Sequence, residues 1–143
     1  MLRRVIVAVS LVALAAQPAW AEIGRIKQSI GAAALERGKA RLPAAAGLQV
    51  QEGDVLVTGK DGRISLTFID NTRFSAGPNS RIAVSEFKFD RATKRGSFVT
   101  QVNRGSLAIV SGQIAHSGRD AMKVRTPTSL LGVRGTRFVV KVP

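Results

Sequence analysis

The sequence predicts an all-β domain built from short strands. Apolar residues alternate with polar ones along much of the chain, and turn-forming residues interrupt this alternation roughly every 8–12 positions. Alternation with a period of two places one side of a strand against a core and the other side in water. Hydrophobic residues make up 45% of the chain, which is enough to build that core. No linker interrupts the pattern, so we expect a single domain.

The first 21 residues have the three parts of a secretory signal peptide. Arg3 and Arg4 precede an apolar run over 5–16, and Ala19-Trp20-Ala21 has small residues at both positions that matter for cleavage. The apolar run is shorter than the ~20 residues of a relaxed membrane span. We therefore expect cleavage after Ala21, with retention as an uncleaved anchor as the alternative. The mature domain would cover 22–143, carry no membrane span, and be periplasmic or secreted.

The mature chain contains a series of alternating segments that predict half-buried strands. The apolar residues expected on the core faces are Ile26 and Ile30; Ile64, Leu66 and Phe68; Ile82 and Val84; Leu107 and Ile109; and Phe138, Val140 and Val142. The apolar phase shifts within 86–89, which predicts a β-bulge near Glu86. The alanines of 32–46 favour helix, but Gly38 and Pro43 interrupt them. We expect a strand up to about Arg37 and then a loop up to Gly47.

Glycine and aspartate mark the turns between these strands. Gly53 and Gly62 permit bends, while Asp54 and Thr58 are expected to cap exposed backbone amides. Asp61-Gly62 is the strongest hairpin signal and suits a type I′ turn. These turns lack the dense oxygen pattern of a calcium loop, so no metal site is predicted.

The most distinctive motif joins Thr126-Pro127 to the glycine-rich run over 131–136. Proline has no amide to donate, so its strand is expected to begin there or to lie at a sheet edge. Arg134 stands between two glycines and is expected to be structural. A guanidinium has five donors in a rigid fork, and it could bind turn carbonyls or a carboxylate such as Asp54 or Asp70.

Together these motifs resemble the FecR-type periplasmic domain over about 30–142. The resemblance rests on five runs, namely Asp54 with Thr58-Gly59, Asp61-Gly62-Arg63, Phe68–Thr72, Gly77-Pro78 with Ser80, and Thr126-Pro127 followed by Arg134-Gly135-Thr136. It implies a β-helix-like roll, with a β-sandwich as the alternative, and a role in envelope signalling. The residues assigned to the motif, all expected to be structural, are Gly53, Asp54, Thr58, Asp61, Gly62, Asp70, Thr126, Pro127, Arg134, Gly135 and Thr136.

The chain departs from the full-length sensors of that family. A signal peptide stands where those sensors carry a cytoplasmic segment that holds a sigma factor, followed by a membrane helix. The sensors also continue into a second lobe beyond the strand that follows the Arg-Gly-Thr run. We therefore expect a stand-alone FecR domain protein, for which the resemblance carries over in fold and compartment rather than in sigma-factor binding.

Composition excludes several function classes. The chain has no cysteine and one histidine, which removes disulfides, thiolate ligands, cysteine nucleophiles and multi-histidine metal sites. Ser111, His116 and Asp120 are close in sequence, but a catalytic triad needs a scaffolded nucleophile. We expect no enzyme activity and no cofactor. The formal net charge of +13 would suit nucleic acid, but export and the absence of an aromatic stacking set argue against it.

The predicted function is an exported, non-catalytic binding or sensory module. Its expected partner is another envelope protein, either an outer-membrane transporter or a membrane-bound signalling protein. The alternative is a basic structural or carbohydrate-binding module that rests on peptidoglycan or lipopolysaccharide, since a strongly basic surface attracts anionic polymers.

Overall fold

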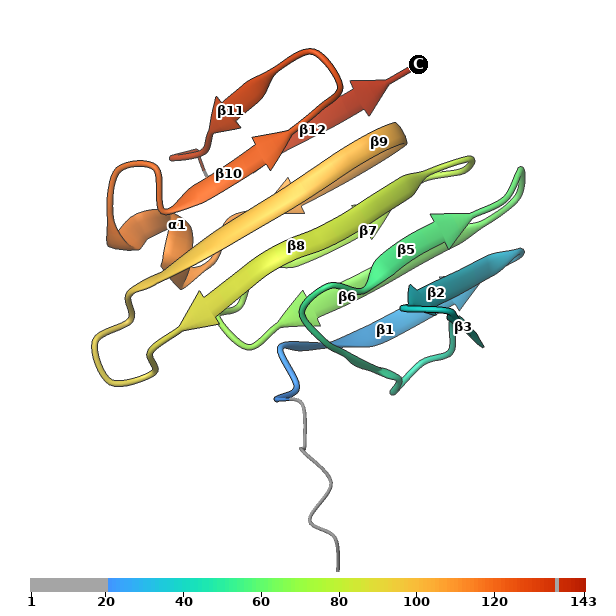
Figure 1. Cartoon of the computed structure of the whole chain (residues 1–143), viewed down its shortest axis with the longest axis horizontal. Coiled ribbons are helices and arrows are strands. Elements are labelled where there is room, and N and C mark those ends of the chain that lie inside the picture. The colour runs from blue at the N-terminus through green and yellow to red at the C-terminus, as the bar shows by residue number, and fades with distance from the viewer. Residues whose placement is uncertain (1–20, 136) are drawn as a thin grey trace, which may run out of the picture.

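The computed structural model describes residues 21–135 and 137–143, and the fold within that range is almost entirely β (Figure 1). The expected signal segment over 1–20 lies outside the described residues. The elements are β1 (Gly24–Ile30), β2 (Ala33–Arg37), β3 (Ala40–Pro43), β4 (Gln49–Val50), β5 (Val55–Thr58), β6 (Arg63–Phe68), β7 (Arg73–Ala76), β8 (Arg81–Phe89), β9 (Gly96–Val110), α1 (Gln113–Ser117), β10 (Met122–Arg125), β11 (Leu130–Gly132) and β12 (Arg137–Val142). The all-β prediction is confirmed. Within the described ranges, no helix has the length and apolar character needed to cross a membrane.

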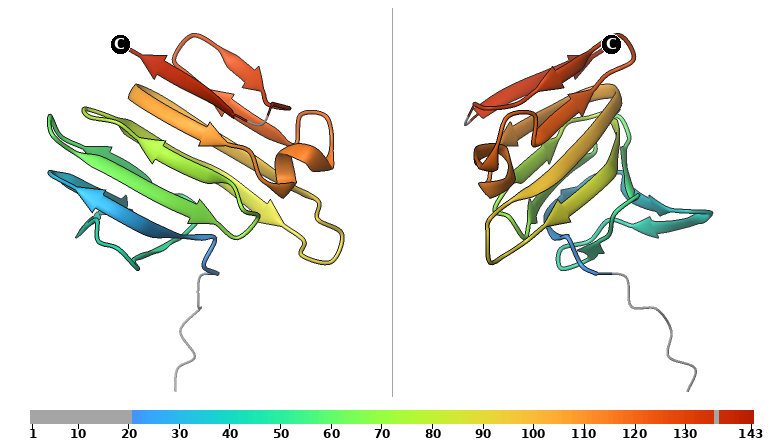
Figure 2. Two further views of the ribbon diagram at one scale, coloured as in Figure 1. Left: turned by 180° about the vertical axis from the view of Figure 1, so that it is seen from behind. Right: turned by 60° about the vertical axis from the view of Figure 1, so that its left-hand side comes forward.

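The strands form one curled sheet whose two halves we call sheet A and sheet B. Sheet A runs in the order β4-β1-β6-β7-β9-β12, and sheet B in the order β3-β2-β5-β8-β9-β10-β11. Neighbours are antiparallel except β9 and β10, which are parallel. The view from behind shows the strands of sheet A side by side, and the rotated view shows the curl (Figure 2).

Strand β9 belongs to both halves. Its first part, 96–104, pairs with β8 and β10, and its second part, 105–110, pairs with β7 and β12. The change occurs at Gly105, which has φ of +89° and lies so close to Ser80 that a Cβ atom would collide with it. The buried side changes there too, from even-numbered residues such as Val102 to odd-numbered residues such as Leu107.

Two buried hydroxyls fix the backbone around this crossing. The Ser80 amide donates to Thr58 Oγ1 at 2.9 Å, and Thr58 Oγ1 donates to the Gly77 carbonyl at 2.6 Å. Ser80 Oγ accepts from the Ser106 amide at 3.0 Å and donates to the Gly77 carbonyl at 2.9 Å. These bonds join the turn before β8 to β9 and to the end of β5, so we call the pair Thr58 and Ser80 the hydroxyl tie.

The core between the two halves is centred on four phenylalanines. Phe68 and Phe74 come from sheet A, and Phe87 and Phe98 come from sheet B. Phe68 and Phe98 meet edge to face with centroids 4.7 Å apart, and Phe87 and Phe98 do so at 4.8 Å. Such pairs add to the stabilisation from burial alone. The aromatic cluster therefore joins sheet A to sheet B across the interior.

The alanine-rich stretch folds differently from the prediction in its second half. The strand up to Arg37 is confirmed as β2, but the expected loop is wrong because β3 returns antiparallel to β2 over Ala40–Pro43. Gly38, with φ of +58°, makes the tight turn between them. The hydrophobic pattern does not indicate this hairpin, because β3 has four residues and ends at a proline.

The predicted bulge at Glu86 is confirmed by a register shift between Val84 and Glu86. The expectations for the Asp61-Gly62 turn and for Ile30 were wrong. Asp61-Gly62 does not form a hairpin, because β5 lies in sheet B and β6 in sheet A. Gly62 is instead required by packing, since a Cβ would collide with the Ala32 carbonyl. Ile30 is 48% exposed because a register shift after Ile26 turns its side chain outward.

Thr100 offers a test of the core. Its side chain is fully buried, and Oγ1 has no hydrogen-bond partner within the described part of the chain. A buried hydroxyl without a partner is destabilising, so Thr100→Val should raise the free energy of unfolding by about 1 kcal/mol. Thermal denaturation followed by circular dichroism would show a rise in Tm of a few degrees.

Thr72 provides the matched control for that experiment. Its hydroxyl is also buried, but it donates to Asp70 Oδ2 at 2.7 Å. Thr72→Val should therefore lower Tm. A Tm for Thr100→Val at or below that of the wild type would contradict the prediction.

Candidate functional site

Asp54, the first motif carboxylate, is held by an arginine that the sequence did not single out. Arg37 Nε and Nη2 donate to Asp54 Oδ1 and Oδ2 at 2.9 and 2.8 Å, and the Gln51 amide donates to Oδ2 at 2.8 Å. The hydrogen bond to Asp54 raises the pKa of Arg37. The expected pairing of Arg134 with Asp54 is therefore wrong. Asp54 follows Arg37 by 17 residues, and only the sheet pairing brings them together.

Asp70, the second motif carboxylate, is fully buried and accepts three hydrogen bonds. The Thr72 amide donates to Oδ1 at 3.1 Å, while the Thr72 hydroxyl and the Ile114 amide donate to Oδ2 at 2.7 and 3.2 Å. Asp70 thus joins the β6–β7 turn to the start of α1, and its expected pairing with Arg134 is also wrong.

Arg134 and Gly135 are exposed between β11 and β12, and Thr136 lies outside the described residues.

The remaining motif residues lie in separate turns. Asp61 Oδ1 accepts from the Ala32 amide at 3.2 Å. Gly53 has φ of +90° in the turn before β5. Thr126 Oγ1 accepts from the Ser129 amide at 3.0 Å, so Pro127 lies in the β10–β11 turn. The strand that follows Pro127, β11, begins at Leu130 and is paired with β10 only within the described chain, so it lies at the sheet edge. The structure brings the motif residues into several turns rather than into one site.

No hydrogen bond joins Ser111, His116 and Asp120 to one another within the described part of the chain. Ser111 Oγ donates to the Gly135 carbonyl, and His116 is exposed on the short helix α1. In the described ranges, no group of three histidine, aspartate or glutamate side chains is placed to hold a metal ion. Three outer surfaces remain as candidates for a binding site.

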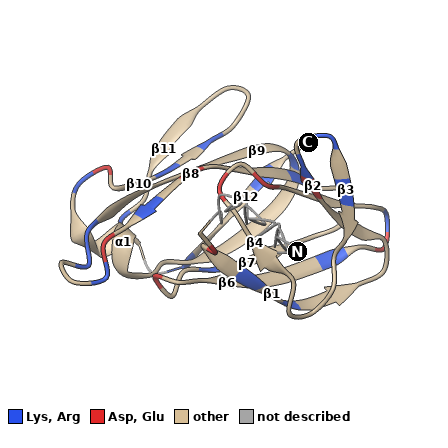
Figure 3. Ribbon diagram, turned by 60° about the horizontal axis from the view of Figure 1, so that its bottom comes forward, with Lys and Arg blue, Asp and Glu red and all other residues tan. Residues whose placement is uncertain are grey.

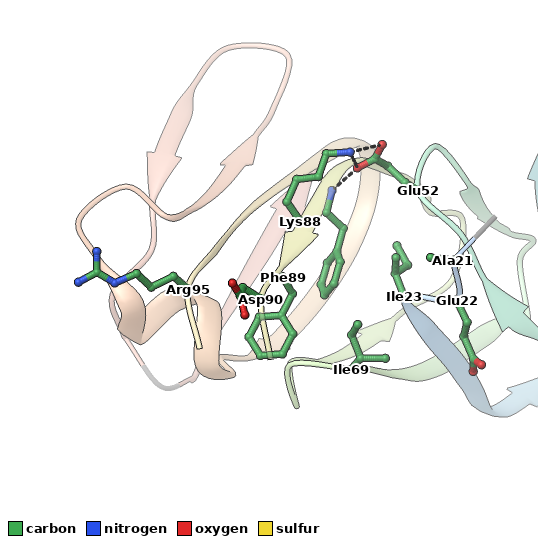
Figure 4. A pocket seen from close by; sticks show the side chains of 10 residues that line it. Ala21, Glu22, Ile23, Glu52, Ile69, Lys88, Phe89, Asp90 and Arg95 are labelled. Atoms are coloured by element: carbon green, nitrogen blue, oxygen red, sulfur yellow. Dashed lines mark hydrogen bonds and ion pairs between the residues drawn. The ribbon is translucent and has the colours of Figure 1, made fainter. Parts of the chain in front are cut away.

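The first surface is an apolar pocket of about 580 Å³ near the start of the described chain (Figure 4). Ile23, Ile69 and Phe89 line it, and Lys88 and Glu52 form an ion pair at its rim, with 3.0 Å between Nζ and Oε2. The Phe87 amide donates to Glu52 at 2.9 Å, and this bond together with Lys88 lowers the pKa of Glu52.

The second surface is the edge formed by β11 and β12, which we call the apolar edge. Each of these strands is paired on one side only within the described chain. Leu130, Leu131 and Val139 are exposed there to 55%, 45% and 61%, and the other exposed large hydrophobic residue in the described chain is Ile30. A groove of about 570 Å³ runs between the β10–β11 turn and β12. Both strands lie together at one end of the molecule (Figure 1).

The third surface is the outer side of sheet A, which we call the basic face. Its centre is a cross-strand row of small or neutral polar residues, and basic side chains stand on both sides of that row. The row is Gln28, Ser65, Ser75 and Ala108, and the basic residues are Lys27, Arg73, Arg137, Arg63 and Lys141. Two adjoining hollows of about 440 and 530 Å³ lie over the row. Among the described residues lining them, none is acidic.

These features define an all-β module in which buried polar residues fix turns. The FecR family, described as FecR protein, matches residues 54–142, which is well over half of the chain. The chain therefore belongs to the FecR family. Comparison with curated proteins and with solved structures gave no match. The family is regulatory and acts in envelope signalling, where its domains are periplasmic.

Replacing Asp70 tests whether this motif residue is structural. In Asp70→Asn one carboxylate oxygen becomes an NH₂ group, which accepts no hydrogen bond. The asparagine side chain therefore cannot accept from all three donors that surround the carboxylate in the wild type. We expect a loss of about 1–3 kcal/mol in the free energy of unfolding. Urea denaturation would measure it. Asp61→Asn is the control, because its single backbone bond survives the change and stability should stay within about 0.5 kcal/mol.

The lowered pKa of Glu52 gives a prediction for pH. A carboxylate whose folded-state pKa is below its usual value of 4.5 stabilises the fold above that pH, and this contribution is lost as pH falls through the folded-state pKa. Glu52→Gln should therefore have a lower Tm than the wild type at pH 7. The difference should shrink below pH 4.5, as measured by thermal denaturation from pH 7 to pH 3. A difference that is constant over this range would contradict the assignment.

Proposed function

We propose that this protein is an exported, non-catalytic binding module that contacts another envelope protein during signalling. The observation that carries the proposal is the apolar edge, where exposed apolar side chains coincide with two strands that are each unpaired on one side. Unpaired strands can accept a strand from a partner, and main-chain hydrogen bonds then supply the affinity. Family membership supports the envelope context.

The other sheet edges of the described chain are less suited to such a contact. Strand β4 has two residues, and β3 has four and ends in Pro43, which has no amide to donate. Strand β12 is longer, with six residues. Short strands and prolines are common means of protecting an edge from unwanted pairing. The apolar edge is therefore the edge on which a partner strand can form the most hydrogen bonds.

The charges around the apolar edge indicate the chemistry of the partner segment. Arg125, at the end of β10, and Arg137 and Lys141, on β12, are all exposed. A segment that combines apolar side chains with aspartate or glutamate would match both features of this surface. We propose a segment of that kind, on an outer-membrane transporter or a membrane-bound signalling protein, as the partner.

Photo-crosslinking from the apolar edge would test the proposal. A photoreactive amino acid at Thr128, an exposed residue that lines the groove, should give a covalent product with one envelope protein, identified by mass spectrometry. Leu131→Lys should abolish that product, because it places a flexible charge where an apolar side chain packs. The control position is Lys39, an exposed residue in the β2–β3 turn, from which no such product should form.

Two results would overturn the proposal. The first is the same product from Lys39 as from Thr128, or a product from Thr128 that survives Leu131→Lys. The second is a product between two copies of this chain, which would make the edge a self-association surface instead.

A further inference from the structure

The basic face has a charge distribution that its fold does not require. Lys27, Arg73 and Arg137 line one hollow, and Arg63 and Lys141 line the other. All five side chains are exposed, and none has an ion-pair partner within the described part of the chain. Adjacent like charges on neighbouring strands repel one another, so this arrangement is costly unless an anion is present.

The shape of the basic face is set by the small residues at its centre. Ser65, Ser75 and Ala108 lie opposite one another on β6, β7 and β9, and both hollows include all three. Arg137 and Lys141 on β12 lie on the two sides of this row, about 13 Å apart at the usual rise per residue. The row continues on β12 at Val139, which pairs with Ala108 and lines one hollow. The result is a shallow trough that crosses the strands, with hydroxyl groups on the part of its floor over β6 and β7, an apolar side chain on the part over β12, and basic walls.

The floor of the trough indicates how a ligand would be recognised. Backbone amides and carbonyls in the middle of a sheet are already paired, so only side chains can contact a ligand there. Gln28, Ser65 and Ser75 offer donors and acceptors, and the two serine hydroxyls bond each other at 3.1 Å. Such groups match sugar hydroxyls, whereas an added peptide strand would need an unpaired edge.

We propose that the basic face binds an extended anionic glycan that carries phosphate groups. The phosphates would contact the arginines and lysines on the walls, and the sugar hydroxyls would contact the serines and the glutamine on the floor. Phe74 is the one aromatic residue among the described residues that line the two hollows, and its side chain is buried in the core. Affinity would therefore come from charge rather than from stacking on a sugar ring. The basic face shares Arg137 and Lys141 with the surroundings of the apolar edge, but the β10–β11 turn, from which the crosslinking is done, does not line either hollow. The two proposals can therefore fail independently.

Binding measurements with a defined oligosaccharide would test this proposal. The probe is the delipidated, phosphate-bearing oligosaccharide of a lipopolysaccharide, and its binding to the mature domain is followed by calorimetry. The triple variant Lys27→Gln, Arg73→Gln, Arg137→Gln should weaken binding at least tenfold and reduce its dependence on salt. The matched control is Arg91→Gln, Lys94→Gln, Arg95→Gln, which removes the same charge from the exposed β8–β9 turn and should weaken binding less than threefold.

Three comparisons identify the ligand class. The dephosphorylated oligosaccharide should bind at least tenfold more weakly. Polyglutamate and vesicles of phosphatidylglycerol, at the same concentration of negative charge, should also bind at least tenfold more weakly. Ser75→Glu, which places a carboxylate on the floor and leaves the five basic residues in place, should abolish binding while Tm stays near that of the wild type.

Four results would overturn the proposal. They are no binding of the phosphorylated oligosaccharide, equal losses in the two triple variants, equal affinity for the dephosphorylated probe, and tighter binding of polyglutamate or of the vesicles. The last result would identify the basic face as a surface for an acidic protein or for a membrane. Both triple variants should keep the wild-type fold, because all six replaced side chains are exposed, and circular dichroism would check this.

Discussion

At Gly105, strand β9 leaves one half of the sheet and joins the other, and its backbone there lies directly against Ser80. The contact is possible because glycine has no Cβ atom and accepts a positive φ. The hydroxyl tie of Thr58 and Ser80 holds the same place through buried hydrogen bonds. Because both halves pair with this one strand, the position of the crossing sets which residues of β9 face the core on each side of it.

The sequence predicted the fold class and most of the core, because alternation depends only on which side of a strand is buried. Ile64, Leu66 and Phe68 are buried as their pattern indicated. The errors occur where the chain changes sheet or register. Asp61-Gly62 has the composition of a hairpin turn, yet its two flanking strands lie in different halves. Ile30 faces outward because of a register shift that leaves no mark in the hydrophobic pattern.

The partly buried ion pair and the candidate surfaces were harder to predict from the sequence. Asp54 was singled out correctly as a turn residue, but its partner Arg37 is brought to it by the pairing of β2 with β5. The positive charge was evident from composition, whereas the alignment of the basic residues from four strands on one face depends on the register of each strand pair. As Figure 3 shows, lysine and arginine are spread along the ribbon, so no single run in the sequence marks the basic face.

The continuity of β9 also bears on how such a module could pass on a signal. Domain motions need a few residues that can change their backbone angles freely. Strand β9 is paired on both sides over 98–101 and 107–110, and at the crossing between them Gly105 packs against Ser80 while the Ser106 amide donates to Ser80 Oγ. The outer side of sheet A and the edge at β11 are therefore held in a fixed geometry. If both proposed contacts form, a rigid module of this kind would act by proximity. Two molecules bound to it at once would be kept at an effective concentration in the ~mM range, without any change in its own shape.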